Sequence, residues 1–188
     1  MPEPELRYAV ILGSVRPERF CDTVASWFTE LLNRDERIDV DLLDPATIRL
    51  PTDLSGGEDT EDFSRRIGAA DAVVIITPEY NHGYSAALKT MIDTVREGWQ
   101  AKPIGFVSYG GVSGGLRAVE QLRGVFGELH AVPLRDTVSF AHAEDSFAAV
   151  GSPLDPHAAE RRAEPLLRTL LWWASTLRDA RHRVPYPA

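Results

Sequence analysis

Residues 71–84 read DAVVIITPEYNHGY, and this stretch decides the fold. The strand expected from Asp71 to Thr77 is apolar at every position from Ala72 to Ile76, which is typical of a strand buried on both faces of a parallel sheet. The polar stretch TPEYNHGY at 77–84 follows it, and a helix is expected from Ser85 to Glu97. The apolar residues of that helix recur at helical spacing: Leu88, Met91, Ile92 and Val95. A buried strand, a short polar turn and a helix together form the repeating structural unit of α/β proteins.

The same order recurs along the chain. Further strands are expected at 7–12, 37–43, 104–109 and, fifth, near 131–134 or 137–140, and further helices at 21–33, about 57–70 and 116–128. A last helix begins with Asp155 as its N-cap, and Pro165 should kink or restart it, because an interior proline removes a hydrogen bond. The alternation predicts a parallel sheet covered on both faces. We expect one domain over 1–188, with a disordered tail after about residue 183.

Composition excludes several classes of protein. The net charge of −8 and the pI near 5.1 argue against a nucleic-acid binder, which needs clustered Lys and Arg. No apolar run is long enough to cross a membrane. The N-terminus, MPEPELR, lacks the basic and then apolar order of a signal peptide, so we expect a cytoplasmic protein. The single cysteine, Cys21, excludes an internal disulfide or a CxxC motif, and a packing role is expected for it.

Ligands of open parallel sheets bind at the carboxyl ends of the strands, which directs attention to three loops. The first, GSVRPERF at 13–20, precedes a helix whose free N–H groups could hold a phosphate. Ser14, Arg16, Arg19 and Thr23 could add hydroxyl and guanidinium donors. The loop matches neither the GxGxxG nor the P-loop pattern, so an ordinary surface loop is the alternative.

The second loop is TPEYNHGY. Pro78 stiffens the turn, and rigid backbone groups beside Tyr80 and Asn81 would suit a flat heteroaromatic ring. The alternative is a turn whose polar side chains face water. Glu79 has no evident partner that would make it a general base, and His82 has no assigned role.

The third loop, YGGVSGG at 109–115, has two possible meanings. It contains G-x-S-x-G, the nucleophile elbow of hydrolases, with Ser113 as nucleophile, Glu144 or Asp145 as acid and His157 as base. A missing oxyanion-hole loop and a short chain argue against this hydrolase. The five histidines show no metal-binding spacing, so no metal site is expected.

Taken together, the loops resemble the NADPH-dependent FMN reductase-like family. The resemblance rests on GSVR at 13–16, TPEYNHGYSAALKTMID at 77–93 and SYGGVSGGLRAVEQLR at 108–123, and it covers residues 7 to about 140. It implies a flavodoxin-like, three-layer α/β fold with a five-stranded parallel sheet of order 2-1-3-4-5 and helices on both faces.

The resemblance also implies an FMN site. Ser14, Arg16 and the following helix start would hold the phosphate, and Arg19 and Thr23 would replace the Ser and Asn of many relatives. The loop residues Pro78, Glu79, Tyr80 and Asn81 would border the flavin ring. Its pyrimidine edge would meet Tyr109, Gly110 and Gly111. A homodimer or homotetramer with flavin near the interface is implied as well.

The implied activity is hydride transfer from NADPH or NADH to bound FMN, with no catalytic side chain. Electrons would then pass to a quinone, an azo or nitro compound, a metal oxyanion or free flavin, or reduced flavin would serve a monooxygenase. An electron-transfer module without NADPH activity is the main alternative, and the Ser113 hydrolase is a weaker one.

Overall fold

The structure is a computed structural model that describes residues 6–149 and 151–187, so the N-terminal residues used in the signal-peptide argument lie largely outside it. The strands are Leu6–Leu12 (β1), Ile38–Leu43 (β2), Ala72–Pro78 (β3), Pro103–Gly110 (β4) and Val132–Ala141 (β5). The helices are Cys21–Leu32 (α1), Glu58–Ala69 (α2), Ala86–Thr94 (α3), Leu116–Glu128 (α4) and Pro156–Arg183 (α5). Short 3-10 turns lie at Glu97–Trp99 (η1) and Ala143–Ser146 (η2).

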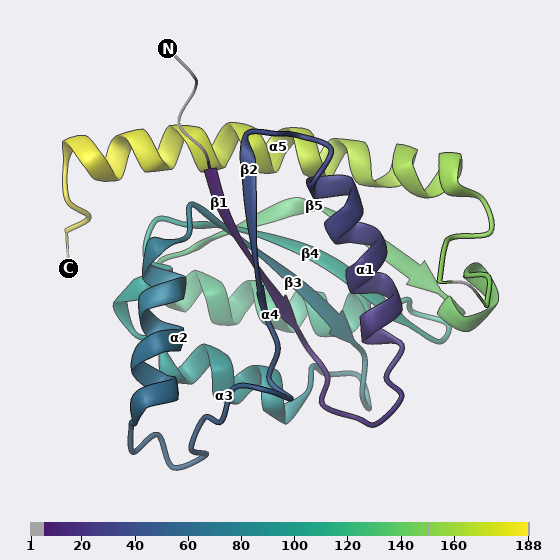
Figure 1. Cartoon of the computed structure of the whole chain (residues 1–188), viewed down its shortest axis with the longest axis horizontal. Coiled ribbons are helices and arrows are strands. Elements are labelled where there is room, and N and C mark those ends of the chain that lie inside the picture. The colour runs from purple at the N-terminus through teal and green to yellow at the C-terminus, as the bar shows by residue number, and fades with distance from the viewer. Residues whose placement is uncertain (1–5, 150, 188) are drawn as a thin grey trace.

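The strands form one parallel sheet in the order β2-β1-β3-β4-β5, which confirms the expected topology (Figure 1). One apolar core joins the sheet to α1 and α5, and a second joins the opposite face to α2, α3 and α4. Since both faces are covered, β3 is buried along its whole length, as its apolar run predicts. Because β1, β3 and β4 are neighbouring parallel strands, their carboxyl ends meet at one edge of the sheet.

Both segments proposed for the fifth strand belong to β5. Ile104 pairs with Pro133 and Phe106 with Thr137, so β5 advances four residues where β4 advances two. The extra residues form a bulge, and the Arg123 side chain donates to carbonyl groups at Leu134 and Arg135. The bulge separates the two apolar segments, which explains why either one alone resembled a complete strand.

The expected restart of the last helix at Pro165 is wrong, because α5 runs continuously from Pro156 to Arg183 (Figure 1). Its buried stripe lies partly on each side of the proline, with Ala163 before it and Leu166 and Leu170 after it. Packing of this stripe on the sheet offsets the hydrogen bond that the proline cannot donate. The Thr169 hydroxyl donates to the Pro165 carbonyl at 2.9 Å, within the next turn.

Replacing this proline is expected to stabilise the protein. Pro165→Ala should raise the free energy of unfolding by about 2 kcal/mol, since alanine gains about 3 kcal/mol in a helix interior and loses about 1 kcal/mol through a more flexible unfolded chain. Urea unfolding followed by circular dichroism measures the change. Glu164→Ala, at the exposed neighbouring position, is the control and should change little. A less stable Pro165→Ala variant would contradict the explanation.

The described chain after α5, residues 184–187, contacts the rest of the protein through Tyr186. Residues 184–187 are exposed, yet the Tyr186 hydroxyl lies 3.0 Å from Nδ1 of His130 and the two rings meet edge to face. Disorder of this tail stays a prediction, and this contact opposes it.

Candidate functional site

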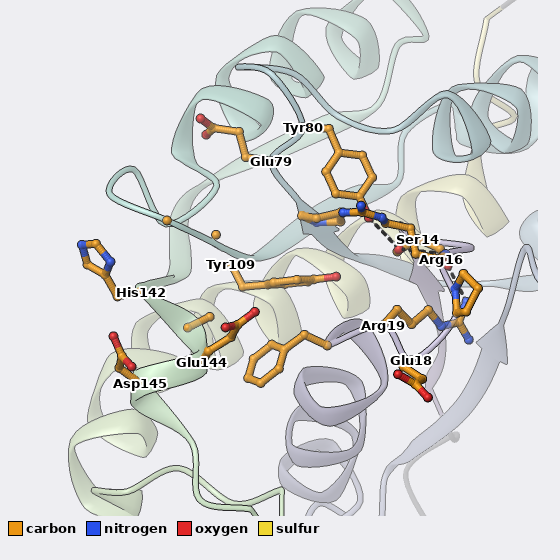
Figure 2. A pocket seen from close by; sticks show the side chains of 16 residues that line it. Ser14, Arg16, Glu18, Arg19, Glu79, Tyr80, Tyr109, His142, Glu144 and Asp145 are labelled. Carbon is orange, nitrogen blue, oxygen red and sulfur yellow. Dashed lines mark hydrogen bonds between the residues drawn. The ribbon is translucent and has the colours of Figure 1, made fainter.

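A cavity of about 840 Å³ lies at the carboxyl ends of the strands (Figure 2). Its volume falls in the range of small-molecule sites, roughly 300–1,000 Å³. The three loops selected from the sequence meet there, together with a fourth segment that follows β5. The lining consists of Ser14, Arg16, Pro17, Glu18, Arg19, Phe20, Pro78, Glu79, Tyr80, Tyr109, Gly110, Gly111, His142, Ala143, Glu144 and Asp145.

The first loop is held against its neighbours at Gly13. The Gly13 N–H donates to the Ile76 carbonyl at 2.7 Å, and a Cβ on Gly13 would lie 2.7 Å from the same oxygen. The Ser85 hydroxyl donates to the Gly13 carbonyl at 2.7 Å. Glycine is needed here because the two backbones approach too closely for any side chain. The loop is thereby fixed to both β3 and the start of α3.

One end of the cavity is formed by Ser14, Arg16, Glu18, Arg19 and Tyr80, so two guanidinium groups and one carboxylate lie there (Figure 2). The Ser14 and Tyr80 hydroxyl oxygens are 2.8 Å apart, and the Arg16 guanidinium lies 5.3 Å from the centre of the Tyr80 ring. Ser14 is fully buried and already bonded. Within residues 6–149 and 151–187, no carboxylate pairs with Arg16. Arg16 is therefore the cation that an anionic ligand would meet without first breaking an ion pair.

Arg19 also lines the cavity, but its guanidinium is already engaged. It forms a two-point ion pair with Asp44, at 2.7 and 2.5 Å, bonds Asp22 at 2.8 Å and donates to the Ser14 carbonyl. The hydrogen bonds from Arg19 hold the pKa of the Asp44 carboxyl below its usual range. Arg19 thus fixes the loop in place. Because its guanidinium is engaged in these contacts, Arg19 is not free to donate to a ligand as Arg16 is.

Two residues expected at the site do not line the cavity. Thr23, in the first turn of α1, lies near Gly151. Asn81 is exposed at the tip of a turn that Tyr80 and Gly83 close with backbone hydrogen bonds of 2.8 and 3.0 Å. Asn81 and His82 both have positive φ, 51° and 69°, which is the geometry of a type I′ turn, and asparagine tolerates it well. The conformation of the turn therefore explains the asparagine.

Three helices begin beside this edge of the sheet, and their N-termini differ. Ser85 caps α3 by accepting from the Leu88 N–H at 3.1 Å. Glu79, in the turn that follows β3, caps α4, because its carboxylate accepts from the Arg117 N–H at 3.1 Å. The N-cap residue of α1, Phe20, forms no side-chain hydrogen bond. Of the three, α1 has the N-terminus at which free N–H groups and the positive end of the helix dipole favour an anion.

Glu79 has partners that the sequence did not reveal. Its carboxylate accepts from the Arg117 guanidinium at 2.9 Å, and its side chain is only 7% exposed. Burial alone would raise the pKa of Glu79, but hydrogen bonds from the Ser113 hydroxyl and from Arg117 lower it overall. Ser113 thus contacts a carboxylate, while His157 is exposed at the start of α5 and is not part of the lining. This arrangement does not support the hydrolase alternative.

The segment 142–145 and the Phe20 ring were not predicted as parts of the flavin site, although Glu144 or Asp145 was considered as the acid of the hydrolase. The His142 N–H donates to the Gly111 carbonyl at 3.0 Å, which ties the end of β5 to the glycine-rich loop. The Phe20 ring lies 5.8 Å from the Tyr109 ring. The rule that ligands bind beyond strand ends could have found residues 142–145, but only if the end of the fifth strand had been known.

Cys21 is fully buried, and burial raises the pKa of its thiol to about 11. This agrees with the expected packing role. In the described part of the chain, no group of three His, Cys, Asp or Glu residues could hold a metal ion. None of the described helices is both long and apolar enough to span a membrane.

The sheet order and the cavity across the strand ends define a flavodoxin-like α/β protein. The chain belongs to the NADPH-dependent FMN reductase family, whose sequence model matches residues 6–145. This confirms the resemblance noted in the sequence.

Individual relatives agree with this assignment. An NAD(P)H-dependent FMN reductase of Schizosaccharomyces pombe is 40% identical over 131 residues, which are 64% of this chain and 65% of the relative. The matched segment thus spans just under two thirds of that relative. An NADPH:quinone oxidoreductase of Arabidopsis thaliana is 29% identical over 88% of this chain and 90% of its own. A solved structure with a similar fold is that of FerB, a flavoenzyme NAD(P)H:(acceptor) oxidoreductase from Paracoccus denitrificans. It superposes with a TM-score of 0.75 at 24% identity, and the match covers 91% of this chain and 98% of that one. The likeness shows a shared fold.

Proposed function

We propose that this chain is an FMN-dependent NAD(P)H oxidoreductase that acts as a single FMN-binding domain. Membership of the NADPH-dependent FMN reductase family supports the class of reaction. The observation that carries the proposal is the end of the cavity at the start of α1. An uncapped helix N-terminus, at α1, and an unpaired guanidinium, at Arg16, lie there together, while the N-termini of α3 and α4 already have side-chain caps.

These residues fit FMN in a defined orientation. The phosphate would lie at the start of α1 beside Arg16, where backbone N–H groups and a charge-assisted donor converge. The flavin ring would extend toward Gly110 and Gly111. An added Cβ on Gly111 would meet no atom within 4 Å, so its backbone faces open space in which a flat ring can approach. Tyr109 lies between the two ends of the cavity and is nearly buried (Figure 2).

The protein's part in the reaction is to bind and orient. The chemistry that FMN supplies when bound is the acceptance of a hydride from NAD(P)H and the delivery of electrons to an acceptor. The ion pair between Arg19 and Asp44 holds the first loop, at 13–20, in its conformation. The Ser14–Tyr80 hydrogen bond joins that loop to the turn after β3. Burial raises the pKa of Tyr109, so its phenol stays protonated and neutral beside the ring. No side chain is required as a general acid or base.

The acceptor that we propose is a small molecule, with quinones first because a relative in Arabidopsis thaliana is named an NADPH:quinone oxidoreductase. We also propose a homodimer or homotetramer that covers the cavity mouth. Val112, on the loop after β4, is 80% exposed, and Leu116, the first residue of α4, is half-exposed, which suits a subunit contact there. Service to a monooxygenase and a cytoplasmic location stay predictions from the sequence.

The test is the flavin spectrum and turnover of purified protein. The protein should carry a flavin absorption spectrum, or acquire it when FMN is added, and should oxidise NADPH with a quinone as acceptor. Retained flavin that NADPH cannot reduce would overturn the reductase and favour an electron carrier. A protein that binds no flavin and loses esterase activity on Ser113→Ala would instead support the hydrolase.

A further inference from the structure

Glu79 is a charged residue at the edge of the cavity, with a largely covered side chain, and the proposed reaction does not use it. Its Cβ lies 3.6 Å, and its backbone nitrogen 3.9 Å, from the place that a Cβ on Gly110 would occupy. The two residues follow Pro78 and Tyr109, which pair directly in the sheet. Figure 2 shows the carboxylate turned away from the centre of the cavity, and its hydrogen bonds take it to the start of α4. Glu79 is therefore beside the proposed ring site without reaching into it.

The carboxylate offsets two positive groups at this point. One is the N-terminus of α4, equivalent to about half a positive charge, and the other is the Arg117 guanidinium. Glu79 is 7% exposed, whereas Arg117 is 49% exposed. Water screens the more exposed guanidinium more than the less exposed carboxylate. At Gly110 the field of the carboxylate should therefore exceed that of its partner.

We infer that Glu79 is a positioning residue that lowers the reduction potential of the bound flavin by cancelling the positive end of α4. This inference rests on the proposed function, which places the flavin ring at Gly110 and Gly111. Reduction adds electron density to that ring, so a fixed negative charge nearby makes reduction harder. The uncompensated N-terminus of α4 and the Arg117 cation would make it easier.

Two substitutions separate this effect from simple helix capping. Glu79→Gln keeps the shape and an oxygen acceptor for the Arg117 N–H but removes the charge. We expect reduced FMN to gain about tenfold in affinity relative to oxidised FMN, which for a two-electron couple is a positive shift of about 30 mV. Arg117→Gln removes the cation and should shift the potential in the opposite direction. Glu120→Gln removes an equal charge from the exposed side of α4 and is the control, with no expected shift.

The potential is measured by spectroscopic titration against a reference dye, beside FMN affinity and thermal unfolding of the apoprotein. Shifts of opposite sign in Glu79→Gln and Arg117→Gln support the inference. An unchanged potential with a lower unfolding temperature would overturn it and leave Glu79 as a cap alone. If Glu79→Gln fails to fold, a downward shift in Arg117→Gln still supports the inference, and no shift overturns it. Failure of the unmodified protein to bind FMN would overturn the proposed function, and this inference with it.

Discussion

Arg16→Ala is expected to weaken FMN binding about 30-fold, equivalent to about 2 kcal/mol, through the loss of one charge-assisted hydrogen bond. Arg16 is exposed at the cavity and lies over the Tyr80 ring, so its removal should not change the stability of the apoprotein greatly. Titration of apoprotein with FMN, followed by quenching of flavin fluorescence, measures the change. Arg34→Ala is the control, because Arg34 is equally cationic but pairs with Glu160 outside the cavity.

Riboflavin makes this test specific, because it has the same ring as FMN but no phosphate. The unmodified protein should prefer FMN over riboflavin, and Arg16→Ala should remove most of that preference while leaving riboflavin affinity nearly unchanged. Added inorganic phosphate should compete with FMN in the unmodified protein and compete less in the variant. Equal losses for FMN and riboflavin would place Arg16 beside the ring and away from the phosphate.

The central part of the fold could be predicted because it depends on local pattern. Strands β3 and β4 are buried on both faces, so apolar residues fill most of their positions on both faces. The edge strand β5 is only partly buried and carries a bulge, so its pattern is broken in two. Pro165 shows the converse limit, since a strong local rule was outweighed by packing of α5 on the sheet.

The site could be predicted only to the level of its loops. Topology brings the ends of β1, β3 and β4 together, so three loops could be placed at one cavity from the sequence. Their internal pairing could not be read in this way. Arg19 pairs with Asp44, which is 25 residues away in the sequence, and Glu79 pairs with Arg117, which is 38 residues away. Which arginine is neutralised and which remains free depends on these tertiary contacts, and no local spacing encodes them.

Gly115→Ala is expected to destabilise the protein by about 3 kcal/mol. Gly115 precedes α4 with φ of 86°, a left-handed conformation that costs alanine roughly 1 kcal/mol or more. Its new Cβ would also lie 2.7 Å from the Ser108 Cβ and 2.9 Å from the Tyr109 nitrogen. These atoms belong to the buried strand β4 and cannot move aside freely, so overpacking adds about 2 kcal/mol. Urea unfolding of the apoprotein measures the loss, and unchanged stability would contradict this account.

Gly111→Ala is the matched variant, since it adds the same methyl group four residues away. No atom lies within 4 Å of its new Cβ, and Gly111 is not among the glycines with positive φ, so the apoprotein should lose less than about 0.5 kcal/mol. If the flavin ring approaches this backbone, the methyl group must occupy space that the ring needs, and FMN affinity should fall about tenfold. Gly115→Ala would then act on folding and Gly111→Ala on binding. A Gly111→Ala protein that binds FMN normally would show that the ring lies elsewhere in the cavity.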